Sequence, residues 1–283
     1  MQDIKRRIRS VNSTEHITNA MKLVSAGKLR KAKAIFEKTN ENSHYITHMI
    51  HELFNNSKEI PEDYLAGNRE IKTTCYIVVT SCRGLCGGFN SNILKEAQHD
   101  IDMDWEEPVI FAIGTKAKEY FEKRGYNIYS SYLAPPENIS FLETREMSRP
   151  IIDMYNKGEI DEVVLIYTSF ISSMEQEVKN VTLLPVEIEN DMDIIQNNKD
   201  IEYEPSVEEV FNYLVPKYVE MMIYAAVVES ATCEHAARRI AMENATDNAR
   251  EMLGNLSLTY NRARQSAITD EIIEIVAGSE AQK

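Results

Sequence analysis

The two ends of the chain constrain its fold most, because each is a long segment almost without helix breakers. Residues 1–60 contain no proline and one glycine, Gly27. From Lys217 to the end there is no proline, and Gly254 is the one glycine before Gly278. Proline and glycine are the residues least compatible with a helix interior. We therefore expect one long helix at each end of the chain.

The N-terminal segment shows a helical period. Small or apolar side chains recur on one face, with gaps near Glu15 and Lys28. These side chains belong to Ile4, Ile8, Val11, Thr18, Met21, Ser25, Ala32 and Phe36. The run Asn55-Asn56-Ser57, followed by Pro61, predicts the end of the helix. A helix of about 55 residues is about 80 Å long, so much of it must project beyond a small domain.

The C-terminal segment mirrors the first. After Pro205, the run Ser206-Val207-Glu208-Glu209 predicts a capping box, and Pro216 predicts a kink or a short preceding helix. A stripe at the helix period of about 3.6 residues then follows. It consists of Met242, Ala245, Ala249, Met252, Leu256, Tyr260, Ala263 and Ala267. Because half of these are alanine, a second helix can approach closely, and we expect the two end helices to form an antiparallel coiled coil.

The middle of the chain, about 70–200, changes to the pattern of an α/β domain. Apolar, β-branched runs alternate with helical patterns, as in a Rossmann-like parallel sheet with crossover helices. The predicted strands are 73–80, 108–114, 162–170 and an edge strand in 175–188, and the predicted helices are 91–100, 115–124 and 143–157. The acidic run 189–205 predicts a linker. The expected domains are therefore residues 1–58, 70–200 and 206–283, with the first and last forming a shaft.

Few residues suggest bond chemistry. Arg83–Gly88 (RGLCGG) lies between a predicted strand and a helix, where a phosphate-binding loop would lie, but its spacing matches neither the dinucleotide fingerprint nor the P-loop. We favour a tight turn with positive φ angles. Cys82 and Cys86 do not complete a four-ligand zinc set, so we expect free thiols. His44, His48 and His51 share a helix face, which is more often solvated than metal-binding. We expect no catalytic residue, cofactor or metal.

Charge is unevenly distributed along the chain, whose formal net charge is −14. Residues 1–40 carry ten Lys or Arg against three Asp or Glu, whereas residues 41–205 carry 14 against 30. The basic segment coincides with the first predicted helix. Such asymmetry indicates a charged partner for that helix or, more simply, a solvated face.

Three separated motifs resemble one family, the gamma subunit of F-type ATP synthases. They are Ile4–Ala34 (IKRRIRSVNSTEHITNAMKLVSAGKLRKAKA), Thr80–Ile93 (TSCRGLCGGFNSNI) and Glu234–Ser279 (EHAARRIAMENATDNAREMLGNLSLTYNRARQSAITDEIIEIVAGS). Together they cover about a third of the chain, and the order of elements matches over all of it. The size resembles bacterial members. One departure is Cys82, where the family usually has Asp before Arg-Gly-Leu-Cys-Gly-Gly.

The resemblance implies a non-catalytic rotor stalk at the cytoplasmic side of the cell membrane. Its implied partners are the alpha and beta subunits around the shaft, and the epsilon subunit and c ring beside the middle domain, with no nucleic acid and no cofactor. It places Met21 and Arg238 near an acidic collar of the beta subunits. It places Arg264, Gln265 and Thr269, within RARQSAIT, against a second beta-subunit loop.

Two other hypotheses remain open from the residues alone. One is a nucleotide-binding α/β enzyme whose helical arms serve dimerisation. The other is a static coiled-coil scaffold, which would occur as two copies where a rotor occurs once per three alpha–beta pairs.

Overall fold

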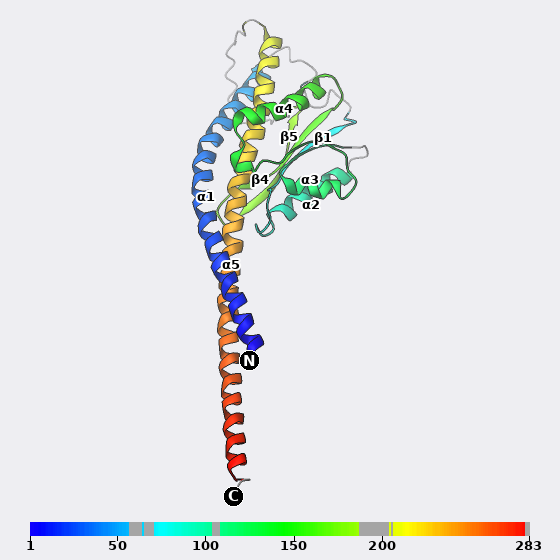
Figure 1. Cartoon of the computed structure of the whole chain (residues 1–283). Coiled ribbons are helices and arrows are strands. Elements are labelled where there is room, and N and C mark those ends of the chain that lie inside the picture. The colour runs from blue at the N-terminus through cyan, green and yellow to red at the C-terminus, as the bar shows by residue number, and fades with distance from the viewer. Residues whose placement is uncertain (57–63, 65–70, 104–107, 187–203, 205, 281–283) are drawn as a thin grey trace. The chain divides into compact units, whose positions relative to one another are not determined.

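The computed structural model describes residues 1–56, 64, 71–103, 108–186, 204 and 206–280 (Figure 1). Its elements in chain order are α1 (Gln2–Asn56), β1 (Thr74–Val79), α2 (Phe89–Met103), β2 (Val109–Ile113), α3 (Thr115–Glu122), β3 (Ile128–Tyr132), η2 (Pro136–Asn138), α4 (Phe141–Asn156), β4 (Glu162–Phe170), β5 (Gln176–Leu184) and α5 (Val207–Glu280). The predicted linker 189–205 lies almost wholly outside the described residues.

The chain divides into two compact units. Unit 1 comprises Met1–Ala26 and Arg238–Lys283, and unit 2 comprises Gly27–Ala237. Both long helices therefore contribute to both units.

The sheet of unit 2 has five strands in the order β3-β2-β1-β4-β5. The first four are parallel to their neighbours, and β5 pairs antiparallel with β4 at the edge. The predicted α/β sheet and its edge strand are thus confirmed. Strand β3 escaped prediction because its sequence, IYSSY, lacks the continuous apolar run of the buried strands, and its residues are at most half-buried.

Apolar side chains cover both faces of this sheet, as expected for a parallel sheet between helices. Alternate residues of the central strands, such as Tyr76 and Val78 of β1, pack against α2 and α3. Their neighbours, such as Ile77 and Val79, face a larger core formed with α4 and with parts of α1 and α5 (Figure 1). The prediction of buried apolar strands is confirmed for β1, β2 and β4, whereas β3 and most of β5 are more exposed.

Within unit 2, α1 and α5 run antiparallel. The rings of Phe54 and Phe211 meet edge to face at 4.9 Å, while Thr47 Oγ1 lies 3.7 Å from Met222 Sδ, so residue numbers rise on one helix as they fall on the other. Of the two alternatives predicted at Pro216, a kink or a short preceding helix, the short helix is wrong, because α5 continues through that proline. Buried neighbours on the same helix face, Val215 and Val219 among them, hold this turn against the larger core.

In unit 1, α1 and α5 also pair antiparallel, which confirms the predicted coiled coil. Glu15 contacts Arg250, Thr18 contacts Thr246, and Lys22 lies 4.0 Å from Glu243. The seam predicted on α1 is largely correct, except that no break occurs. Glu15 itself is buried in the first predicted gap.

The predicted seam of α5 needs one correction. Met252 is 52% exposed, and Leu253, its neighbour in the sequence, is half-buried instead. In the preceding turn, Thr246 rather than Ala245 is the most buried residue of the seam. The seam therefore passes through Thr246 and Ala249 and then steps by four residues to Leu253. Adjacent residues lie about 100° apart around a helix, so this step turns Met252 to the surface.

Helix ends follow local side-chain chemistry. The hydroxyl of Ser206 accepts a hydrogen bond from the Glu209 amide at 3.2 Å, so Ser206 caps α5 as predicted. A complete capping box, missed from the sequence, begins α4: Ser140 accepts from the Glu143 amide, and the Glu143 side chain accepts from the Ser140 amide. Among the described helices, none carries a stretch apolar and long enough for a bilayer span.

Candidate functional site

The five residues singled out from the sequence all lie on the helices of unit 1. Met21 on α1 and Arg238 on α5 are half-buried, whereas Arg264, Gln265 and Thr269 on α5 are exposed. Twenty-six residues separate Arg238 from Arg264, which corresponds to roughly 39 Å along a helix. The structure therefore sorts these residues into two separate levels of the helix pair.

The first level contains Met21 and Arg238. They lie beside a small group of charged side chains. Met21 precedes Lys22, whose ammonium lies 4.0 Å from Glu243, and Glu243 also accepts a hydrogen bond from Arg239 at 3.2 Å. Basic side chains from both helices therefore gather around this point. Such a surface suits an acidic partner.

At the other level, the side chains of Arg264 and Gln265 project from a single helix. The hydroxyl of Thr269 donates to the Gln265 carbonyl at 2.9 Å, which satisfies it within α5. The guanidinium of Arg264 is exposed and offers a planar fork of donors that matches a carboxylate. This arrangement can hold an acidic or carbonyl-rich loop but contains no nucleophile or general base.

Beyond this level, α5 ends in an exposed aliphatic segment. All residues from Ile268 to Ala277 are exposed. The large apolar members are Ile268, Ile272, Ile273, Ile275 and Val276, each between 48% and 71% exposed. Exposed apolar clusters of this kind mark interaction surfaces. The composition of the tip indicates a partner surface that accepts aliphatic side chains.

Polar contacts that the sequence analysis missed hold the helix pair in register. Arg250 Nε donates to one oxygen of the largely buried Glu15 carboxylate at 3.0 Å, and Arg250 Nη2 forms an ion pair with the same oxygen at 3.0 Å. Nearby, the buried hydroxyls of Thr18 and Thr246 are 2.8 Å apart. A polar pair in a coiled-coil seam fixes the register, because any slip leaves buried polar groups unsatisfied. The signal was present in the sequence as an acidic residue inside an otherwise small and apolar seam.

In unit 2, the loop after β1 is the tight turn that was expected. Leu85 and Gly87 have positive φ angles of 62° and 59°. The amide of Ser81 donates to the side-chain oxygen of Asn90 at 3.0 Å, which ties the turn to α2. Cys82, the residue that departs from the family pattern, lies with its thiol 3.2 Å from the Leu133 carbonyl. All four cysteines are free thiols.

This loop borders the crevice where open α/β sheets bind ligands, at the carboxyl ends of β1 and β4. Here α5 fills that crevice. Glu229 accepts hydrogen bonds from the Phe170 amide at 2.7 Å and from the Ser169 hydroxyl at 2.8 Å. Cys233 packs in one cluster with Cys86 and Phe89 of the loop.

Glu229 is a titratable group buried in this crevice. Burial raises the pKa of Glu229, and the hydrogen bonds from Phe170 and Ser169, together with the nearby charges of Lys179 and His44, offset part of that rise. The Glu229 carboxyl thus already accepts the Phe170 amide and the Ser169 hydroxyl at the carboxyl end of β4. The geometry gives no support to a nucleotide site at this position.

Comparison with known proteins decides the family. A family model described as ATP synthase matches residues 1–282. The chain belongs to the ATP synthase gamma family. The ATP synthase gamma chain of Alkaliphilus metalliredigens is 44% identical over 287 residues, which cover 100% of this chain and 99% of that one. That of Ruminiclostridium cellulolyticum is 41% identical over 288 residues, covering 99% and 98%.

Other relatives add range to this comparison. The gamma chain of Acetobacterium woodii, named as sodium ion specific, is 38% identical over 298 residues, covering 99% of this chain and 98% of that one. A chain of the Euglena gracilis mitochondrial ATP synthase shares the fold with a TM-score of 0.73 at 20% identity, covering 99% and 94%. A chain from the central stalk and c ring of Tetrahymena thermophila does so with 0.58 at 24%, covering 81% and 99%. None of these relatives favours the nucleotide-binding alternative.

Proposed function

We propose that this chain is the non-catalytic central stalk of a bacterial F-type ATP synthase. It turns with the c ring inside alternating alpha and beta subunits, so that ion flow drives ATP synthesis, and it turns in reverse during ATP hydrolysis. The observation that carries the proposal is the antiparallel helix pair of unit 1 with its exposed aliphatic tip, found in a chain of the gamma family. The segments 1–58 and 206–283 form the shaft, and the α/β domain, 70–200, contacts the membrane sector.

The partners follow from the chemistry of each surface. The aliphatic tip of α5 runs in an apolar collar of the alpha and beta subunits, and the basic first helix faces acidic beta-subunit loops. Exposed ion pairs are worth only about 0–1 kcal/mol each, so such contacts can be exchanged as the shaft turns. The epsilon subunit and the c ring bind the α/β domain, which places the chain at the cytoplasmic face of the cell membrane as a peripheral subunit.

The proposed contact residues have distinct roles. Met21 and Arg238 face the acidic collar where basic side chains of both helices gather. Arg264, Gln265 and Thr269 contact a second beta-subunit loop further along α5. The exposure of Arg264 and Gln265 supports this assignment, because their removal exposes no core.

The decisive experiment is native mass spectrometry of the assembled complex. One copy of this chain per three alpha–beta pairs is expected, since a single asymmetric shaft must serve three catalytic sites. Two copies per complex would instead identify a static scaffold. Micromolar binding of ATP or NAD to the purified chain in calorimetry would favour the nucleotide-binding enzyme and overturn the rotor assignment.

A further inference from the structure

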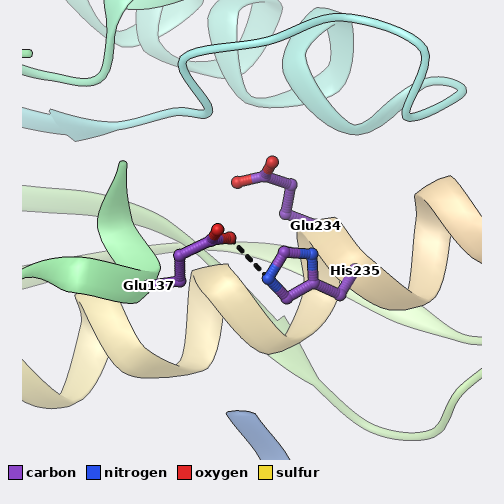
Figure 2. Close-up of side chains that lie close together, drawn as sticks. All are labelled: Glu137, Glu234 and His235. Atoms are coloured by element: carbon purple, nitrogen blue, oxygen red, sulfur yellow. Dashed lines mark ion pairs between the residues drawn. The ribbon is translucent and has the colours of Figure 1, made fainter. Parts of the chain in front are cut away.

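A mixed cluster of metal-ligating groups lies in unit 2, next along α5 to the crevice residue Cys233. It comprises Glu137 of η2 and the adjacent Glu234 and His235 of α5. Figure 2 shows the Glu137 carboxylate facing the His235 imidazole, with the Glu234 carboxylate beside the pair. Glu137 Oε2 lies 2.6 Å from His235 Nε2, and one ligand atom from each of the three residues lies within 4.8 Å of the others.

The cluster is buried rather than spread on the surface. His235 is 1% exposed and Glu234 is 5% exposed, while the side chain of Glu137 is 22% exposed. Charged groups at such depth need partners, and Glu137 pairs with both Lys28 and His235. The rotor function assigns no task to these three residues.

We propose that Glu137, Glu234 and His235 bind a divalent transition-metal ion, of which zinc is the best chemical match. One imidazole nitrogen and two carboxylate oxygens form a three-ligand protein set of the type that zinc accepts, with a water completing the tetrahedron. Ligand atoms about 2.1 Å from a tetrahedral ion are about 3.4 Å apart. The three ligand atoms lie within 4.8 Å of one another, and the pair Glu137 Oε2–His235 Nε2, now at 2.6 Å, must open by about 0.8 Å to admit the ion.

The ammonium group of Lys28 competes with a metal ion for Glu137. Its Nζ pairs with Glu137 Oε1, the other oxygen of the same carboxylate. An arriving dication must share or replace this ion pair. Because Lys28 belongs to α1, the cluster joins three segments of unit 2: α1, the η2 turn and α5. A bound ion would therefore cross-link the turn before α4 to the long C-terminal helix.

The test uses the purified full-length chain titrated with Co²⁺, whose visible absorption reports tetrahedral coordination by nitrogen and oxygen, followed by displacement with Zn²⁺. One ion per chain is expected. His235→Gln should weaken binding by more than the roughly 10–100-fold cost of losing an outer-shell partner, since it removes a direct ligand. His48→Gln is the matched control, because His48 is an exposed histidine on α1 that lies 3.6 Å from Glu52.

The variant Lys28→Gln tests the site through a gain of affinity, which misfolding would not produce. Removing the competing ammonium should raise the affinity for Co²⁺, and the helical circular dichroism of the variant should match that of the parent chain. Equal losses in His235→Gln and His48→Gln, or unchanged binding in His235→Gln, would overturn the proposal. So would a Lys28→Gln variant that binds no more tightly than the parent, even if His235→Gln failed to fold.

Discussion

The buried side chains inside unit 1 and inside unit 2 differ in their chemistry. In unit 2, large aliphatic and aromatic side chains cover both faces of the sheet, and Leu165, Phe111 and Ile151 are almost completely buried. In unit 1, the described residues that are buried are Glu15, Thr18, Ser25, Met242, Thr246 and Ala249. Four of these six are polar. Unit 2 therefore has the core of an independent domain, whereas unit 1 has a seam that specifies register and contributes little hydrophobic stabilisation.

The difference in core packing between the two units is tested most directly by the same Leu→Ala truncation in each unit. Leu165→Ala removes a side chain from the central strand β4, where exposure is 0%, and should cost about 2–5 kcal/mol of unfolding free energy. Leu256→Ala removes a half-buried seam residue of α5 and should cost about 1 kcal/mol. Urea denaturation followed by circular dichroism measures both. Equal costs would mean that the seam is packed as tightly as the sheet.

A second prediction concerns the polar seam itself. Arg250→Ala leaves the carboxylate of Glu15 buried without its guanidinium partner, a loss of about 1–2 kcal/mol for a partly exposed pair. We expect faster amide hydrogen exchange in residues 2–26 and unchanged exchange in β4. Arg262→Ala, an exposed arginine on the same helix, serves as the control and should change neither. Faster exchange in β4 as well would show that the seam supports the sheet domain.

A third prediction follows from the raised pKa of Glu229. Its ordinary value is 4.5, and burial raises it in the folded chain. The protonated form is therefore favoured by folding, so this group contributes stability below about pH 4.5 that is lost as the pH rises through the folded-state pKa. Glu229→Gln keeps an oxygen acceptor for the Phe170 amide and should flatten that part of the stability profile. Denaturation curves between pH 4 and 8 test this, and an unchanged slope in the variant would contradict it.

Much of this comparison could be anticipated from the sequence. Continuous apolar runs identified the buried strands, and β4 was predicted at its observed bounds because Glu162–Phe170 is such an apolar, β-branched run. The seam of α1 followed from its period, since a small side chain every three or four residues has one efficient use in a long helix.

Glu15 stood out in the sequence as an acidic residue in the seam, but the partners in the polar contacts could not be anticipated, because they depend on which residues of two distant segments face each other. Nothing local distinguishes Thr246 from any other helical threonine, or Glu137 from the other acidic residues of the middle domain. The same limit explains β3: its pairing with β2 is dictated by the sheet, while its own residues are polar and half-exposed. Contacts of this kind can be identified only once the relative placement of the paired segments is known.

The smallest expected effect on folding distinguishes a contact surface from a structural one. The double variant Arg264→Ala/Gln265→Ala removes two exposed side chains, so the unfolding free energy of the isolated chain should change by no more than about 0.5 kcal/mol. In the assembled complex, however, coupled ATP synthesis should fall, because the guanidinium fork and the amide are the groups available to a beta-subunit loop at that level. Asp270→Ala removes an exposed side chain that lies roughly 120° or more around the helix from Arg264 and Gln265, so it should leave synthesis unchanged. Because unit 1 buries few residues, its own folding constrains few positions, and its exposed positions can be constrained by contacts with partner subunits instead. Normal synthesis in the double variant would therefore remove this level of α5 from the proposed interface while leaving the fold of the helix pair intact.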